Sequence, residues 1–335
     1  MRTIAACLVI TLLFISASRA ADTLPTSITD QAFFKMINDF SEKGGTFAFE
    51  MYMSNEETFQ DVLPDLLKRV APGGVYLGVA PEQNFTYITA LRPKMAFIID
   101  IRRENMIEHL MYKALFELSP TRATFVSRLF SRPMPATFDP QSSIERVFST
   151  LGSSRSDSRL LSQNLADIRN NLEKAHGFVL TSGDYRTIDT IAKAFYQGGP
   201  DAHLTTYGTT FRNLMMETDR QNKNRNFLVS DANYQLVRQM QQNNLIVPVV
   251  GDFAGSKAVR AVGAYVREHG AEVTSFYVSN VEEYIASPAS VWSSYCNNIA
   301  SLPISGTSTF IRFRRGGQGS SLAPMLPFSK KCVFS

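Results

Sequence analysis

Short apolar runs alternate with segments of helical periodicity along most of this chain. Val75–Ala80 and Met95–Asp100 are apolar on both faces, which is typical of strands covered on both sides in a parallel sheet. Glu104–Leu118 instead carries apolar residues three or four positions apart, the spacing of one helix face. We therefore predict an α/β domain with a doubly wound, mostly parallel, Rossmann-like sheet.

The same alternation returns in the last third of the chain. Leu245–Phe253, Val273–Val278 and Ser308–Phe313 are predicted as further strands. Ser256–His269 and Ala289–Ile299 are predicted as helices that follow the first and second of these strands. The sheet is thus expected to contain elements from both ends of the chain.

Two helices are predicted before the first strand. Gln31–Phe40 forms an entry helix, and a second helix begins near Phe59, where apolar periodicity resumes. Ser54 or Asn55 is expected to be the N-cap of that second helix, because both residue types accept hydrogen bonds from free backbone N–H groups.

The middle of the chain is mainly helical in pattern. Polar, Ser-rich or Gly-Pro breaks separate the predicted helices Ile144–Leu151, Leu160–Lys174, Tyr185–Gln197 and Asn233–Gln242. We predict one domain over residues 21–335 with a helical insertion at about 121–243, which either elaborates the connections of the sheet or covers the site as a lid. The basic, Gly-rich segment Arg312–Gly319 is expected to be a solvated tail.

Residues 1–20 have the parts of a secretory signal peptide. Arg2 supplies a positive start, Ile4–Ile15 is an apolar run too short to span a bilayer, and Ser18-Arg19-Ala20 places small residues before the cleavage point. The mature chain is therefore expected to begin at about Ala21 and to reside in the periplasm or outside the cell. An uncut signal anchor is the alternative. No later apolar run is long enough for a membrane span.

Composition narrows the function classes. The chain is 44% hydrophobic and 19% charged, as expected for a globular protein, and loss of Arg2 and Arg19 lowers its formal charge from +4 to +2. A charge so near neutral gives no reason to expect nucleic acid as a partner. Cys296 and Cys332 remain after cleavage, either paired or as two free thiols. Composition does not predict an oligomeric state.

Three predicted strand ends carry candidate ligand-binding residues, since ligands of open parallel sheets lie beyond the carboxyl ends of the strands. Asp100 lies 22 positions after Gly78, where such folds hold a nucleoside ribose by its hydroxyls. The alternative is that Asp100 caps the helix beginning near Arg103. Arg102 belongs to the same candidate group.

The loop after the first strand lacks the GxGxxG pattern, which argues against a dinucleotide cofactor. Pro81, Glu82 and Gln83 stand there instead. Glu82 and Gln83 are candidates for holding a polar, partly cationic ligand, and a solvated turn begun by Pro81 is the alternative.

Further candidates lie near the other strand ends. Gly251 permits a sharp exit from its strand, and Asp252 is a candidate acceptor for a ligand amine or else an N-cap for the helix from Ser256. Weaker candidates for a substrate are Asn55, Glu56, Tyr207, Tyr277 and Asn280.

Several other chemistries lack their motifs. The chain has no GxSxG elbow and no HExxH pair, and its four histidines are scattered without ligand spacing. We therefore expect neither a hydrolase nor a metal site, and no residue is assigned a catalytic role.

Four longer segments of the sequence resemble a known family. Tyr76–Tyr87, Ala96–Arg103, Val249–Phe253 and Phe276–Glu282 resemble an uncharacterised bacterial family that is itself similar to class I S-adenosylmethionine-dependent methyltransferases. The resemblance implies a seven-stranded, mostly parallel sheet. By the same likeness, Asp100 would hold the ribose hydroxyls of S-adenosylmethionine and the Gly78 loop would pass under its methionine part, with Asp252 near the methyl group.

Two functional hypotheses follow. The first is an exported methyltransferase-like protein that binds S-adenosylmethionine or a related adenosine-containing small molecule. The second is an exported, non-catalytic small-molecule-binding protein on the same fold. Ala80, Pro81 and Glu82 stand where methyltransferases have closely spaced glycines, which favours the second hypothesis.

Overall fold

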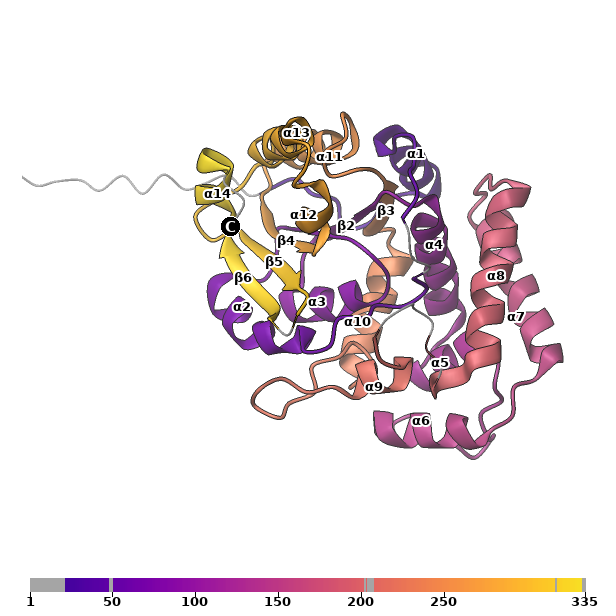
Figure 1. The fold of residues 1–335 in the computed structure, drawn as a ribbon. Helices are drawn as coiled ribbons and strands as arrows, with labels where there is room; N and C mark the ends of the chain where they lie inside the picture. Colours follow the sequence, from indigo (N-terminus) through magenta and orange to yellow (C-terminus); the bar gives the residue numbers. More distant parts are fainter. Residues whose placement is uncertain (1–21, 48–50, 202, 204–207, 317, 333–335) are drawn as a thin grey trace, which may run out of the picture.

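A mostly parallel sheet forms the centre of the protein. The computed structural model describes residues 22–47, 51–201, 203, 208–316 and 318–332. Six strands lie in the order β3-β2-β1-β4-β5-β6, and all neighbours are parallel except β5 and β6 (Figure 1). The strands are β1 (Val75–Gly78), β2 (Met95–Asp100), β3 (Ile246–Val250), β4 (Val273–Ser279), β5 (Thr309–Arg314) and β6 (Gly319–Pro324). The predicted α/β, Rossmann-like class is confirmed.

The strand order reverses at β1. This strand pairs with β2 on one side and β4 on the other, and every residue of β1, β2 and β3 is buried. Burial of both faces explains why these strands contain apolar runs rather than an alternation of apolar and polar residues.

The C-terminal edge of the sheet corrects two expectations. The described residues form six strands rather than seven, and Arg312–Gly319 is not a solvated tail. Arg312 is 7% exposed within β5, and the chain then turns back to pair as β6. The sequence of β6, Gly319–Pro324, has little apolar or β-branched character, because its backbone pairs at the sheet edge without contributing many core side chains.

Helices cover both faces of the sheet. On one face, α11 (Ala258–Glu268) contacts β2 and packs between α1 (Asp30–Phe40) and α13 (Ala289–Ala300). A second group of helices covers the opposite face (Figure 1). The second is η1 (Phe59–Val62), α2 (Leu63–Arg69), α3 (Gln83–Leu91), α4 (Arg103–Leu118) and α10 (Asp231–Gln242).

Helix α4 is covered on nearly all sides. It packs against β2 and β3 and also contacts α5, α8 and α10, so that every residue from Asn105 to Phe116 is buried. The helices that pack against α4 from outside the sheet come mostly from residues 121–243. This segment forms α5 (Arg122–Phe130), α6 (Ile144–Ser153), α7 (Ser158–Asn170), η2 (Asn171–Ala175), α8 (Ser182–Gly198), η3 (Gly199–Asp201), α9 (Phe211–Met216) and α10. Polar residues of α4 are therefore buried by helices that come later in the chain.

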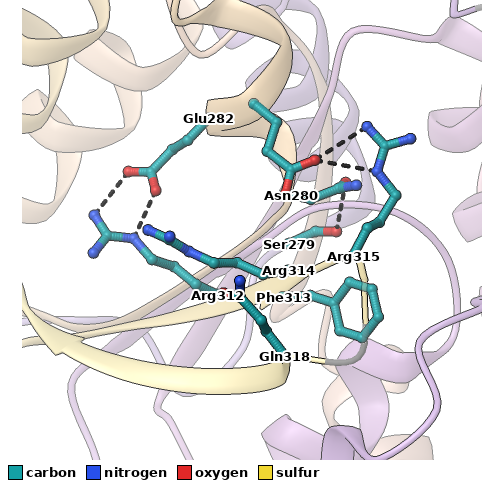
Figure 2. A pocket seen from close by; sticks show the side chains of 9 residues that line it. Ser279, Asn280, Glu282, Arg312, Phe313, Arg314, Arg315 and Gln318 are labelled. Atoms are coloured by element: carbon teal, nitrogen blue, oxygen red, sulfur yellow. Dashed lines mark hydrogen bonds and ion pairs between the residues drawn. The ribbon is translucent and has the colours of Figure 1, made fainter. Parts of the chain in front are cut away.

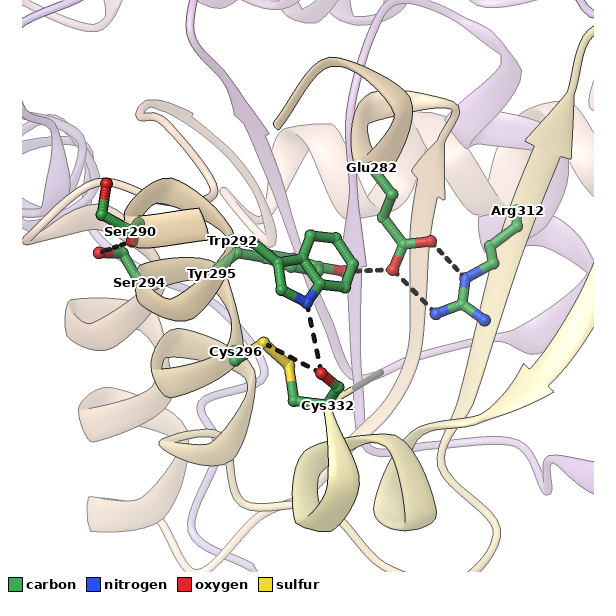
Figure 3. The surroundings of a disulfide bond; sticks show 8 residues. All are labelled: Glu282, Ser290, Trp292, Ser294, Tyr295, Cys296, Arg312 and Cys332. Atoms are coloured by element: carbon green, nitrogen blue, oxygen red, sulfur yellow. Dashed lines mark hydrogen bonds and ion pairs between the residues drawn. A yellow bond between two sulfur atoms is a disulfide. The ribbon is translucent and has the colours of Figure 1, made fainter. Parts of the chain in front are cut away.

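A disulfide fastens the C-terminal helix. Cys296 of α13 and Cys332, which follows α14 (Met325–Lys331), form this bond with their Cα atoms 5.7 Å apart (Figure 3). The indole N–H of Trp292 donates to the carbonyl of Cys332 at 3.3 Å. Of the two alternatives for these cysteines, the structure selects pairing, and a disulfide is typical of an oxidising compartment.

Within the described part of the chain, no helix combines the length and apolar character that crossing a bilayer requires.

Candidate functional site

A crevice lies beyond the carboxyl ends of four neighbouring strands. Its cavity measures about 420 Å³. The lining comes from the ends of β1 to β4, from α12 (Val281–Ile285) and from the segment between α1 and η1: Thr46, Phe47, Met51, Val79, Ala80, Ile99–Arg102, Gly251–Phe253, Ser279–Val281, Tyr284 and Ile285. This is the place where open parallel sheets hold their ligands, next to the strand at which the order reverses.

The structure brings together the three predicted strand ends. Asp100, Arg102, Gly251, Asp252 and Asn280 line the crevice. Among the described residues, none from 121–243 contributes to this lining, so the insertion covers α4 rather than this cavity.

Asp100 is held in a fixed orientation by Arg102. Its Oδ1 accepts hydrogen bonds from the backbone N–H of Arg102 at 2.8 Å and from the Nε of that residue at 3.1 Å. Its Oδ2 accepts from Nη2 at 3.0 Å, and Nη1 of Arg102 donates to the carbonyl of Met51 at 3.2 Å. The carboxylate of Asp100 thus closes the turn at Arg102 without accepting from an N–H group of α4, so it is not the predicted helix cap, and Asp100 also lines the crevice. With two acceptor sites on each carboxylate oxygen, Oδ1 is saturated and Oδ2 keeps one free site.

Asp252 does not cap the helix that follows. Its Oδ1 accepts from the N–H of Ala254 at 2.9 Å, which closes a short turn, and α11 begins only after Lys257. Glu42 takes the expected role instead, because its two carboxylate oxygens accept from the N–H groups of Asp252 at 3.2 Å and Lys257 at 3.1 Å. No local sequence pattern predicts this contact, because Glu42 and Lys257 lie 215 positions apart in the chain.

Gly78 makes room for a side chain of the protein itself. A Cβ added to this residue would lie 1.9 Å from Oδ1 of Asn84. The Nδ2 of Asn84 donates to the carbonyls of Val79, Ala80 and Pro81 at 2.8, 2.9 and 2.7 Å, and the phenol of Tyr76 donates to Oδ1 at 2.9 Å. The loop after β1 is therefore shaped from within, and Asn84 fills the space beside Gly78.

Glu82 and Gln83 are fully buried at the start of α3. Both carboxylate oxygens of Glu82 lie 3.1 Å from the N–H of Ser54, while the hydroxyl of Ser54 accepts from the N–H of Gln83 at 3.2 Å. Ser54 thus caps α3 and not the helix near Phe59, for which Asn55 is no cap either, since Thr58 precedes η1. Glu82 and Gln83 are not among the crevice-lining residues.

Glu56 belongs to a buried network beside the crevice. Gln83 Nε2 donates to Glu56 Oε2 at 3.1 Å, and Ser279 Oγ donates to Oε1. Tyr277 is buried next to this network and is hydrogen-bonded to Glu56. Ser279 also lines the crevice, so the network forms part of its supporting wall. Tyr207 lies outside the described residues, and Asn55 packs against Gly208.

Burial changes the protonation of these carboxyl groups. Loss of water raises the pKa of Glu56 and of Glu82 to about 7, although hydrogen bonds from their partners oppose the shift. Glu108 of α4, which the sequence analysis did not select, has a pKa well above its usual range, first because of burial and then because of Glu82. Burial lowers the pKa of His109 to about 4, and its Nε2 lies 2.9 Å from the carbonyl of Ala80.

Two aromatic residues at the crevice were not predicted. The rings of Phe47 and Tyr284 meet edge to face with centroids 5.1 Å apart, and both line the cavity. Neither follows a predicted strand, so strand-end reasoning does not find them. Such rings offer an apolar surface for a flat ligand group.

The charged residues in the described lining of the crevice are Asp100, Asp252 and Arg102. Among its described lining residues, none is histidine, lysine or cysteine. The described residues also contain no group of three or more His, Cys, Asp or Glu that could hold a metal ion.

Comparison with known proteins identifies a family and no activity. A search among curated proteins found no match. Residues 51–325, which include all six strands, match the model of a domain of unknown function, DUF7790. Since the match covers most of the chain, this protein belongs to the DUF7790 family.

Proposed function

We propose that this protein binds a small molecule of the adenosine type, S-adenosylmethionine or a relative of it, in the crevice at the carboxyl ends of β1 to β4. The observation that carries the proposal is the position of Asp100 at the end of β2, where it lines a cavity next to β1, the strand at which the sheet order reverses. Asp100 would accept a hydrogen bond from a ribose hydroxyl at Oδ2, which still has a free acceptor site.

The size and lining of the crevice support this ligand class. Its volume of about 420 Å³ lies within the usual range for small-molecule sites, and most of its walls are apolar. Phe47, Phe253 and Tyr284 provide rings against which a purine could pack. Arg102 holds the carboxylate of Asp100 in place before any ligand arrives, which lowers the cost of ordering on binding.

Methyl transfer is one use of such a site, because it demands mainly that a nucleophile be positioned in line with the methyl group. A second candidate is binding without chemistry. Asn84 favours it, since this side chain fills the space beside Gly78, in the loop that by the resemblance would pass under the methionine part of the cofactor. We also propose that the protein acts outside the cytoplasm, which the leader pattern and the Cys296–Cys332 disulfide support.

The test is calorimetric titration of residues 21–335 with S-adenosylmethionine and S-adenosylhomocysteine. Asp100→Asn should weaken binding about tenfold, the loss expected when hydrogen bonds to a charged acceptor are removed. Asp184→Asn is the matched control, because Asp184 is also nearly buried and paired with an arginine, Arg103, but lies outside the crevice.

The outcomes separate the candidates. Binding that Asp100→Asn weakens and Asp184→Asn leaves unchanged supports the adenosine proposal. Absence of heat and of any thermal shift at millimolar ligand contradicts it. Where binding occurs, mass spectrometry of the ligand after incubation with cell extract distinguishes conversion to S-adenosylhomocysteine from binding alone.

A further inference from the structure

A smaller hollow adjoins the crevice and contains three arginines. Its cavity measures about 200 Å³ and lies between the end of β4, α12 and the β5–β6 hairpin (Figure 2). Ser279 and Asn280 line both this hollow and the crevice, so the two cavities meet at these residues.

Two of the three arginines are neutralised by neighbouring carboxylates. Arg312 forms a two-point ion pair with Glu282, with distances of 2.6 Å from Nε to Oε2 and 2.8 Å from Nη2 to Oε1. Arg315 donates from Nε and Nη2 to one oxygen of Glu283 at 3.1 and 3.0 Å. These pairs frame the hollow and account for both of its acidic residues.

Arg314 carries the remaining charge. It lies two positions after Arg312 on β5, so its side chain leaves the same face of the strand. In the view of Figure 2 its guanidinium lies next to the Arg312–Glu282 ion pair, and it has no hydrogen-bond or ion-pair partner among the described residues. The hollow therefore has one unbalanced positive charge, and the amide groups of Asn280 and Gln318 in its wall can donate hydrogen bonds as well.

The hollow is built on rigid supports. The guanidinium of Arg312 lies over the rings of Phe310 and Phe328, at 4.7 and 5.2 Å from their centroids. Tyr295 donates to Glu282 at 2.9 Å and so holds the other half of that ion pair (Figure 3). The guanidinium of Arg315 lies 5.1 Å from the ring centroid of Tyr284, which also lines the crevice.

We propose that this hollow is an anion subsite, in which Arg314 binds a carboxylate or phosphate group of the ligand whose body lies in the crevice. A guanidinium in a concave, partly desolvated site favours such groups because it can donate two parallel hydrogen bonds to them. The inference rests on the proposed function for the body of the ligand and adds that the ligand is anionic at one end.

The experiment compares adenosine, adenosine 5′-monophosphate and S-adenosylhomocysteine by calorimetry at low ionic strength. The two ligands with an anionic group should bind about tenfold more tightly than adenosine, as one charge-assisted hydrogen-bond pair allows. Arg314→Gln should remove this advantage and leave adenosine binding unchanged. Arg155→Gln, a change at an exposed arginine between α6 and α7, should affect none of the three ligands. The anionic ligand that binds more tightly shows whether the subsite prefers phosphate or carboxylate.

A second measurement keeps this inference separable from the proposed function. Titration with inorganic phosphate, followed by NMR of the arginine side chains, should shift the Arg314 signal in the unaltered protein. Adenosine binding without any advantage for the anionic ligands overturns the subsite alone. A phosphate-induced shift of Arg314 without adenosine binding overturns the proposed function alone. Absence of both effects overturns both.

Discussion

Asn84 shows how one side chain sets the shape of a loop. Its amide holds three successive carbonyls after β1 while its oxygen accepts from Tyr76, and only a residue without a Cβ fits at Gly78 beside it. All of these groups are buried or nearly so, which makes each hydrogen bond costly to break. The glycine is therefore required by packing inside the protein.

Gly78→Ala should destabilise the protein by about 2 kcal/mol or more, since the added methyl group would collide with Oδ1 of Asn84. Urea unfolding measures this loss. Gly306→Ala is the control, because a Cβ there meets no atom within 4 Å. Equal stability of the two variants would contradict the packing role of Gly78.

The buried carboxyl groups predict a dependence of stability on pH. Glu82 has a pKa of about 7 in the folded protein because burial disfavours its charge, against 4.5 for the unfolded chain. Between these two pH values the folded protein keeps a proton on Glu82 that the unfolded chain has released. The stability that this proton contributes is fully present below pH 4.5 and is lost as the pH rises through about 7. Glu56 acts in the same direction. His109, whose pKa is lowered to about 4, acts in the opposite direction between pH 4 and 6.5.

Glu82→Gln isolates one of these groups, since glutamine resembles the neutral acid. Between pH 4.5 and 8 the variant should gain up to about 3 kcal/mol in unfolding free energy relative to the unaltered protein. Urea titrations at several pH values measure the difference. Glu268→Gln, at an exposed glutamate of α11, should leave the pH profile unchanged. A profile of Glu82→Gln parallel to that of the unaltered protein would refute the assignment.

At the scale of the elements, α14 depends on a covalent bond. The Cys296–Cys332 disulfide joins it to α13 across 36 residues, and α14 supplies Phe328 to the support of Arg312. Replacing both cysteines by serine should cost about 4 kcal/mol, the contribution that chain entropy gives to a disulfide closing a loop of this length. Thermal unfolding measures the loss, and reduction of the unaltered protein should reproduce it. Unchanged stability in both cases would show that α14 is held by packing alone.

Elements with strong periodicity could be predicted from the sequence. Met95–Asp100 is a strand over the predicted residues and Glu104–Leu118 differs from α4 by one residue, because a continuous apolar run and apolar residues at helical spacing are distinct patterns. Strand β6 could not be predicted, since it pairs with β5 through its backbone while few of its side chains are apolar. The start of α3 was also missed, since Ser54, a residue 29 positions away from Gln83, supplies its cap.

The candidate site was predictable to a similar extent. Asp100 and Asp252 reach the crevice because parallel strands end at one edge of the sheet, which topology alone implies. Glu56 and Glu82 have the same polar character, yet the fold turns them inward, and only tertiary contacts decide between the two outcomes. The arginine hollow was mistaken for a tail because isolated basic residues give no sign of their partners Glu282 and Glu283.

At the scale of the whole molecule, the leader pattern predicts that the protein acts outside the cytoplasm. Expression with the leader in a bacterial host should yield a protein outside the cytoplasm whose N-terminus is at about Ala21, because small residues precede that position. N-terminal sequencing of the purified protein tests this. Ala20→Arg, which replaces a small residue before the cut, should leave the leader attached. Recovery of uncut protein in the cytoplasm from the unaltered gene would contradict export.

The packing of the first described residues bears on the order of events during export. Asp22 pairs with Lys94 at 2.7 Å, the N–H of Thr23 donates to the carbonyl of His269 at 2.9 Å, and Leu24 is 8% exposed. Proteases act on exposed, unstructured segments, and a cut before Ala21 would lie one residue from this packed region. If the predicted leader is cut there, its removal must come before the chain closes on itself. The peptidase and the folding reaction would then compete in time, and a fast-folding chain would risk keeping its leader.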